Sequence, residues 1–219
     1  MLIVTVFAVL LLAYVVLRSI QSRARLSRSL DIQMLQVLLP KDIAQEEREE
    51  GIGDSIKERI GVAEQFLSTL SVLPTSFMDR IIYGRPSIVF EIVARPHGGI
   101  FFYAGTYRKY IDHLEKQIYA HYPEAEVTLA DEYTIFSLHD TVRIATLTLR
   151  RKQYLPIATY KELEVDPMQA LTGAMAKIQS TDAALIQYVL QSASRRQAHR
   201  AARAARRTVQ GKQSDISSS

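Results

Sequence analysis

The sequence predicts an α+β domain that an N-terminal transmembrane helix holds at a membrane. Three observations support this fold class. Residues 1–17 carry no charge and are followed at once by arginines. Strand-like segments, rich in β-branched or alternating apolar residues, then alternate with helix-like segments whose apolar residues recur at helical spacing. A segment rich in arginine and alanine follows them. The expected divisions are a transmembrane anchor over 1–20, a basic linker over 21–30, a cytoplasmic α+β domain over 31–194, and a basic helix with a polar tail over 195–219.

The anchor is the best defined of these segments. An apolar run of about 18–20 residues can cross the hydrocarbon core as a helix that satisfies its own backbone. Positive charge next to such a run marks the cytoplasmic side. We therefore expect a single pass through the inner membrane, with the N-terminus outside and the body in the cytoplasm. The membrane-orienting residues are Arg18, Arg23, Arg25 and Arg28.

Two other interpretations of this run are a cleaved signal peptide and a buried core helix. A signal peptide has its positive charge before the apolar run and small residues at a cleavage site. Here the arginines come after the run, and no A-x-A pattern follows it. A buried core helix rarely starts at residue 1 with no polar face, and residues 1–17 have no polar face.

Charge is distributed unevenly along the chain. The net charge is +4 with 27 basic and 23 acidic residues, and ten of the basic residues fall within 18–28 and 195–207, where no acid occurs. Basic ends around a mildly acidic body predict contact with anionic lipid or nucleic acid at the ends. The chain has no cysteine, so disulfides and thiol chemistry are excluded.

The first half of the body alternates strand and helix patterns. Residues 31–39 form a predicted strand that Pro40 ends. An amphipathic helix follows, capped by Asp54 and ended by Pro74, and its apolar residues recur at helical spacing. Residues 87–94 and 100–104 are predicted strands joined by a turn at 96–99, which makes a hairpin.

The second half continues in the same way. A helix is expected over 108–121, and a strand begins at 126–129. Residues 141–150 alternate apolar and polar side chains and predict another strand. Asp166 and Pro167 form a helix opening, an N-cap followed by proline at the first helical position. The last expected strand covers 183–190.

The first six elements follow the order β-α-β-β-α-β, which is the connectivity of a ferredoxin-like split βαβ unit. The segment from Ile100 onward repeats this order, so two such units are expected to overlap or lie side by side. The helices should pack on one face of a mostly antiparallel sheet.

Two stretches, 107–127 and 166–194, resemble a known bacterial domain. It is an uncharacterised N-terminal domain of membrane-anchored proteins that precedes type IV secretion DNA-binding ATPase domains of the coupling-protein and HerA/FtsK-like kind. The resemblance covers most of residues 31–194 and implies a module of a secretion or DNA-translocation assembly with protein partners. The matching residues are Gln117, Tyr122, Pro123, Glu126, Asp166, Pro167, Lys177 and Gln187.

The chain departs from that pattern in one respect. An ATPase of this kind carries G-x-x-x-x-G-K-[ST], whose backbone amides and lysine hold the phosphates, and no such motif occurs here. We therefore expect the anchor domain alone, as a separate subunit or as a split or truncated product, with no enzymatic activity and any ATP hydrolysis supplied by a partner.

The sequence shows little sign of a metal site or of a nucleophilic active site. The nearest group to a metal site is Asp131, Glu132, His139 and Asp140, which we interpret as polar residues of a loop. No G-x-S-x-G elbow is present for a nucleophilic serine. We expect no metal, no cofactor, no small-molecule substrate and no catalytic residues.

The basic C-terminal segment is the main candidate for binding. Its arginines recur at positions i, i+4, i+7 and i+11, one face of a helix, and alanines fill most of the rest. Such a row can neutralise phosphates of DNA, RNA or anionic lipid, can meet an acidic partner, or can be a solvated helix only. Nucleic-acid binding by this helix at the membrane is the alternative function. The candidate residues are Arg196, Arg200, Arg203 and Arg207.

Overall fold

The computed structural model describes residues 2–40, 52–71, 73–95, 99–130, 135, 141–149, 167–178 and 182–209. The chain forms two compact units. The first consists of residues 1–135 and 178–192, and the second of residues 136–177 and 193–219. Each unit is described by itself below.

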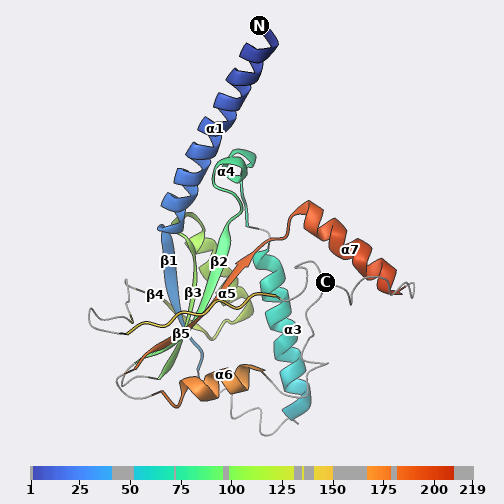
Figure 1. The fold of residues 1–219 in the computed structure, drawn as a ribbon. Helices are drawn as coiled ribbons and strands as arrows, with labels where there is room; N and C mark the ends of the chain where they lie inside the picture. Colours follow the sequence, from blue (N-terminus) through green and yellow to red (C-terminus); the bar gives the residue numbers. More distant parts are fainter. Residues whose placement is uncertain are drawn as a thin grey trace. The chain divides into compact units, whose positions relative to one another are not determined.

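The first unit begins with one long helix, α1 (Leu2–Ser29), seen at the N-terminus in Figure 1. The part from Ile3 to Ser29 is long and apolar enough to span a membrane, and none of its most apolar window is buried against the protein. The segment 21–30, expected as a basic linker, is helical through Ser29 and continues the same helix. It has no proline or glycine, and its arginine, alanine, leucine and glutamine residues all favour helix.

One antiparallel sheet forms the centre of this unit, with the strand order β4-β1-β3-β2-β5. The predicted strands at 31–39, 87–94, 100–104, 126–129 and 183–190 are all confirmed, with small changes at their ends. β2 and β3 form the expected hairpin. The bounds are β1 (Ile32–Leu38), β2 (Ser87–Ala94), β3 (Ile100–Tyr107), β4 (Glu126–Leu129) and β5 (Ala184–Gln191).

Three helices of this unit come from the segments between the strands. α3 (Ile52–Leu70) precedes α4 (Phe77–Ile82), and a 3-10 turn, η1 (Arg108–Tyr110), leads into α5 (Ile111–His121). Both long helices were predicted, but Asp54 is not an N-cap, because α3 begins two residues before it and places Asp54 in the first turn. The six-residue α4 was not predicted, because so short a segment has no measurable period.

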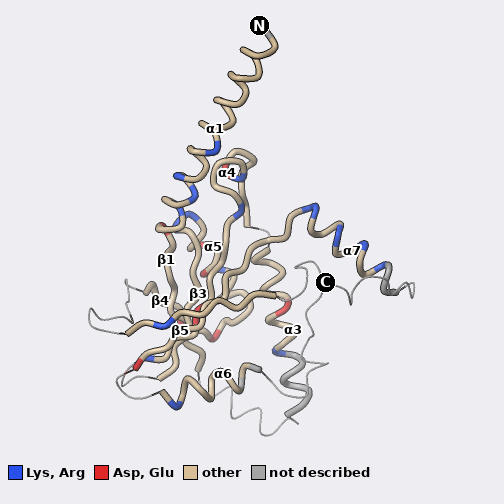
Figure 2. The backbone as a smooth tube through the Cα atoms, viewed as in Figure 1, with Lys and Arg blue, Asp and Glu red and all other residues tan. Residues whose placement is uncertain are grey.

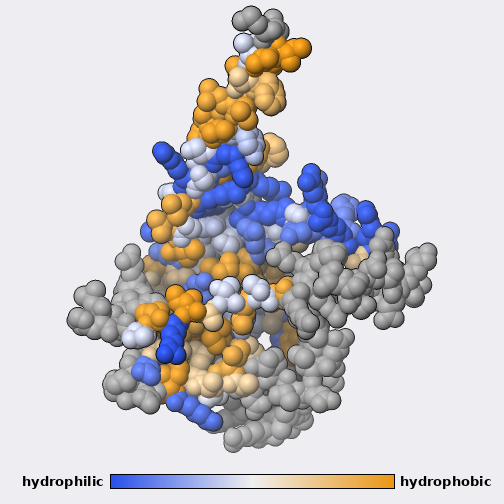
Figure 3. Space-filling model, in the orientation of Figure 1, coloured by the Kyte–Doolittle hydropathy of each residue, from blue (hydrophilic) through white to orange (hydrophobic). Residues whose placement is uncertain are grey.

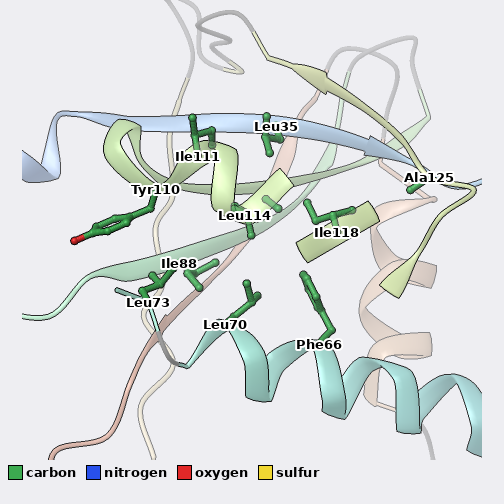
Figure 4. Close-up of a cluster of buried hydrophobic side chains, with 11 residues drawn as sticks. Leu35, Phe66, Leu70, Leu73, Ile88, Tyr110, Ile111, Leu114, Ile118 and Ala125 are labelled. Carbon is green, nitrogen blue, oxygen red and sulfur yellow. The ribbon is translucent and has the colours of Figure 1, made fainter. Parts of the chain in front are cut away.

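The core lies between α3, α5 and one face of the sheet. Phe66 and Leu70 of α3 point toward Leu114 and Ile118 of α5 (Figure 4), and all four side chains are buried. Alternate strand residues complete the cluster from the sheet side, because successive side chains of a strand point to opposite faces. These strand residues are Leu35, Ile88 and Ala104.

The second unit contains α6 (Pro167–Met175) and α7 (Arg195–Val209). Both helices were predicted, and Pro167 stands at the start of α6 as expected. Asp166, its predicted N-cap, lies outside the described residues.

The strand predicted over 141–150 is wrong for the residues that the structure describes, 141–149, which form no regular element. Ile144 and Leu147 of the alternating pattern are 87% and 91% exposed. Alternating apolar and polar residues supply one apolar face, but a β-strand also needs an adjacent strand that pairs with its backbone N–H and C=O groups. In the described part of the chain, each of the five strands is paired with others of the five, and none with this segment.

A close approach of β1 and β3 depends on a glycine. Gly105 faces Met34 in the antiparallel register. A Cβ atom at position 105 would lie 2.9 Å from the backbone carbonyl oxygen of Gln33 and would collide with the sulfur of Met34. The side chain of Met34 can move, whereas the backbone of β1 cannot move without loss of its pairing.

We expect Gly105→Ala to lower the free energy of unfolding by about 1–3 kcal/mol, the usual cost of overpacking. Gly61→Ala is the matched control, because a Cβ atom at position 61 on α3 has no neighbour within 4 Å. That substitution should stabilise the protein by about 0.5–1 kcal/mol through helix propensity. Chemical denaturation of the full chain in detergent measures both, and equal effects of the two substitutions would contradict this account of Gly105.

Candidate functional site

The candidate site lies where α1 ends and the sheet begins. The guanidinium carbon of Arg28 lies 5.0 Å from the ring centre of Tyr83, 4.5 Å from that of Tyr107 and 5.5 Å from that of Tyr110. A guanidinium group within about 6 Å of an aromatic ring centre is attracted to the ring face. We call Arg28 and these three rings the tyrosine cage.

The cage joins α1 to three separate parts of the body. Tyr83 follows α4, Tyr107 ends β3 and Tyr110 belongs to η1. Tyr110 is only 2% exposed, and the hydroxyl of Tyr107 shares a hydrogen bond of 3.0 Å with the hydroxyl of Ser87 at the start of β2. The rings are therefore held by the body, and Arg28 attaches the end of α1 to them.

Two ion pairs lie next to the tyrosine cage. Arg108 donates to the carboxylate of Asp31 over 3.3 Å, and the backbone N–H of Arg108 donates to the carbonyl oxygen of Asp31 over 3.1 Å. Lys109 donates to the carboxylate of Asp79 over 2.7 Å. The first pair ties the residues just after α1 to η1, and the second ties α4 to η1.

The pair of Lys109 and Asp79 holds both groups in their charged forms. The hydrogen bond from Lys109 lowers the pKa of Asp79 below its usual 3.8. The same hydrogen bond raises the pKa of Lys109 above its usual 10.5. The contribution of Asp79 to stability is thus present above its unfolded-state pKa and is lost as the pH falls through its lower folded-state pKa. Near neutral pH the pair is intact.

The four arginines that were predicted to orient the protein in a membrane all lie on α1. Figure 3 shows apolar side chains over the N-terminal part of α1 and hydrophilic ones around its C-terminal turns. Arg25 lies beside Gly84, whose φ of +80° turns the chain out of α4; a Cβ atom there would be 3.7 Å from the Nε atom of Arg25. Arg18 and Arg23 lie on earlier turns of the helix and are exposed.

The sequence did not reveal the cage or α4. The three tyrosines lie 55 to 82 residues beyond Arg28 in the chain, and no motif links them. The only local signal was Ser76, a residue type that commonly begins helices, which accepts a hydrogen bond of 3.0 Å from the backbone N–H of Asp79.

A cavity of about 360 Å³ lies in the same unit, between the end of α3 and the neighbouring ends of β2 and β5. Leu70, Leu73 and Ile88 contribute apolar walls, and Arg80 and Arg85 also line it. Arg85 donates to the carbonyl oxygen of Ser192 over 2.7 Å, which fixes the end of β5 to the start of β2. Apolar and basic side chains thus line the cavity together, as they also occur together around the C-terminal end of α1.

The predicted binding residues of the C-terminal segment lie on α7. Arg196, Arg200 and Arg203 are exposed, and at 100° per residue they fall within an arc of about 60°. Arg207 is part of the same helix, but its side chain lies outside the described residues. Figure 2 shows the basic residues spaced along this helix, so the expected row of arginines is confirmed for the first three positions.

A row of polar side chains crosses the sheet on the face away from α3 and α5. Gln36, Tyr103, Glu91 and Gln187 are partners in the strand register. Gln187 donates to the buried carboxylate of Glu91 over 2.6 Å. Arg95 donates to the hydroxyl of Tyr103 and lies 5.1 Å from the ring centre of Phe101. This row stabilises the sheet.

In the described part of the chain, no three side chains of histidine, cysteine, aspartate or glutamate lie close enough to hold a metal ion. The group of Asp131, Glu132, His139 and Asp140, considered from the sequence, lies outside the described residues.

The chain belongs to the family described as "Domain of unknown function (DUF8128)", whose model matches residues 55–216. The match includes α4, the three tyrosines of the cage and α7, and it begins after α1 and β1. No curated protein and no solved structure matches the chain.

We expect Arg28→Gln to lower the free energy of unfolding by about 1–2 kcal/mol, because a partly buried guanidinium group loses its contacts with three rings. Arg23→Gln, an exposed arginine on the same helix, is the control and should change stability by less than about 0.5 kcal/mol. Thermal unfolding of the full chain in detergent measures both. If the two variants unfold alike, the cage does not attach α1 to the body.

Proposed function

We propose that this protein is a non-catalytic, membrane-anchored module that holds an α+β domain against the cytoplasmic face of the inner membrane. In this proposal α1 crosses the membrane once, with the N-terminus outside. The observation that carries the proposal is that the uncharged run and the arginine-rich turns form one continuous helix, whose last arginine is held by the body. The arginines then favour the cytoplasmic side for the body.

We further propose that β1, α3, β2, β3, α5 and β4 form a ferredoxin-like split βαβ unit. The supporting observation is the strand order β4-β1-β3-β2 with every neighbouring pair antiparallel and with both long helices against one face. β5 adds one further strand, on the far side of β2.

The partner that we propose is a DNA-translocating ATPase of the type IV secretion kind. The resemblance described for 107–127 and 166–194 supports this class of partner. These 219 residues contain no phosphate-binding G-x-x-x-x-G-K-[ST] motif. The proposed role of the body is therefore assembly, with ATP hydrolysis supplied by the partner.

A second candidate function rests on α7. Three exposed arginines on one face of a regular helix are suited to the phosphates of nucleic acid. No phenylalanine, tyrosine or tryptophan lies between them, so contact with the backbone rather than base stacking would supply most of the affinity. This would make the protein a membrane-tethered nucleic-acid-binding protein.

The proposed orientation can be measured because the chain has no cysteine. Ser68→Cys places a single thiol at an exposed position of α3. We expect a membrane-impermeant maleimide to label it in inside-out vesicles and to leave it unlabelled in intact cells. Changing Arg18, Arg23, Arg25 and Arg28 together to Glu should reduce this asymmetry, because the charge bias next to the span is removed.

The matched control is the same change at Arg196, Arg200 and Arg203, which follow the uncharged run by 179 or more residues in the sequence and should leave the orientation intact. Labelling of Ser68→Cys in intact cells would disprove the proposed orientation. Release of the unmodified protein by carbonate washing would disprove the anchor.

Capture of the full chain from its own membranes in mild detergent distinguishes the two functions. We expect an ATPase with a phosphate-binding loop to be enriched, and nuclease treatment to leave it bound. Recovery of DNA without such an ATPase would favour the second candidate. In that case the variant with Arg196, Arg200, Arg203 and Arg207 changed to Ala should lose the DNA, and capture from the unchanged protein should weaken steeply with salt.

A further inference from the structure

Helix α4 exposes an apolar face. Phe77, Met78 and Ile81 are 75%, 61% and 37% exposed, and no residue of α4 is buried. At 100° per residue these three side chains fall within an arc of about 100°. Ser76 caps the helix, and Asp79 ties it to Lys109 through an ion pair. A defined helix that contributes nothing to the core and presents large apolar groups on its surface indicates a contact surface.

The position of α4 in the fold indicates which kind of partner its apolar face contacts. α4 packs beside α1 within the same unit, and Figure 1 shows it beyond the ends of the strands, alongside the C-terminal half of α1. Arg25, the neighbour of Gly84, lies eight residues after the last residue of the uncharged run, which is about 12 Å along the helix. α4 itself is about 9 Å long, and the headgroup region extends about 5–8 Å beyond the hydrocarbon core. α4 is thus within reach of the headgroups of the leaflet that α1 enters.

The charges around α4 fit an anionic lipid surface. Arg80 of α4 is accompanied by Arg108 and Lys109 of η1 and by the arginines at the end of α1. Asp79, the single acid of α4, is paired with Lys109. Large apolar groups beside basic ones are the features of segments that lie in the membrane interface.

The geometry points to α4 as a second membrane contact, in which Phe77 and Met78 enter the interface of an anionic leaflet next to the point where α1 crosses it. This inference rests on the proposed function, because it requires α1 to span the membrane. Together α1 and α4 fix the tilt of the body relative to the membrane. With α1 as the single contact the body could rotate about that helix, and the second contact through α4 restricts this rotation.

The test uses tryptophan fluorescence, because the chain contains no tryptophan. Phe77→Trp and Met78→Trp each place one reporter on α4. Phe7→Trp reports on the anchor, about 15 Å from the end of the uncharged run. Phe102→Trp is the control in the body, 51% exposed on β3. The full chain is reconstituted in vesicles of phosphatidylglycerol and phosphatidylcholine that carry a doxyl quencher at acyl carbon 5 or 12.

We expect the shallow quencher, at carbon 5, to reduce the emission of Phe77→Trp and Met78→Trp about twofold, as for a group 5–10 Å into the interface. The deep quencher should act mainly on Phe7→Trp, and neither should affect Phe102→Trp. Vesicles of phosphatidylcholine alone should give weaker quenching at positions 77 and 78, because the attraction to basic residues is lost.

The other outcomes separate the two proposals. Quenching at position 7 without quenching at 77 or 78 overturns this inference, assigns the α4 face to a protein partner and leaves the anchor in place. Equal quenching at 77 and 102 also overturns it, because the contact is then not specific to α4. An unquenched Phe7→Trp overturns the proposed function and this inference with it.

Discussion

The contact of Arg28 with Tyr83, Tyr107 and Tyr110 determines how the rest of the structure relates to α1. None of the most apolar window of α1 is buried against the described part of the protein. Through this one guanidinium group its last turn is joined to α4, to the end of β3 and to η1. A rotation of α1 about its axis would withdraw Arg28 from all three rings. The helix is therefore attached in one orientation rather than hinged to the body.

The attachment of α1 through Arg28 gives the basic residues in this region different roles. Arg18 and Arg23 are exposed, whereas Arg28 is in contact with the body of the protein. Arg108 and Lys109 extend the basic region onto the body, and each also makes an ion pair that holds neighbouring elements together. The same residues thus build the end of the domain next to α1 and give that end the charge that an anionic leaflet attracts.

Several elements could be predicted because their signals are local. β2 is rich in β-branched residues and lies between turn residues, and α7 combines alanine with arginines at helical spacing. The strand predicted over 141–150 had an equally good local pattern and was wrong for its described residues, 141–149. Alternation identifies a segment that is able to form a strand, but the formation of a strand depends on a partner for its backbone.

Local features of the sequence are enough to predict the apolar helix with its basic end, the five strands of the sheet and the basic C-terminal helix. Hydropathy, periodicity and charge along a short segment are sufficient for these features. Only the folded chain shows that the five strands form one sheet, that Gly105 lies against the backbone of β1, that Arg28 contacts three tyrosines, and that α4 lies beside α1. Each of these depends on the register between segments far apart in the chain. No local pattern encodes such a register, because it is set by the packing of the whole core.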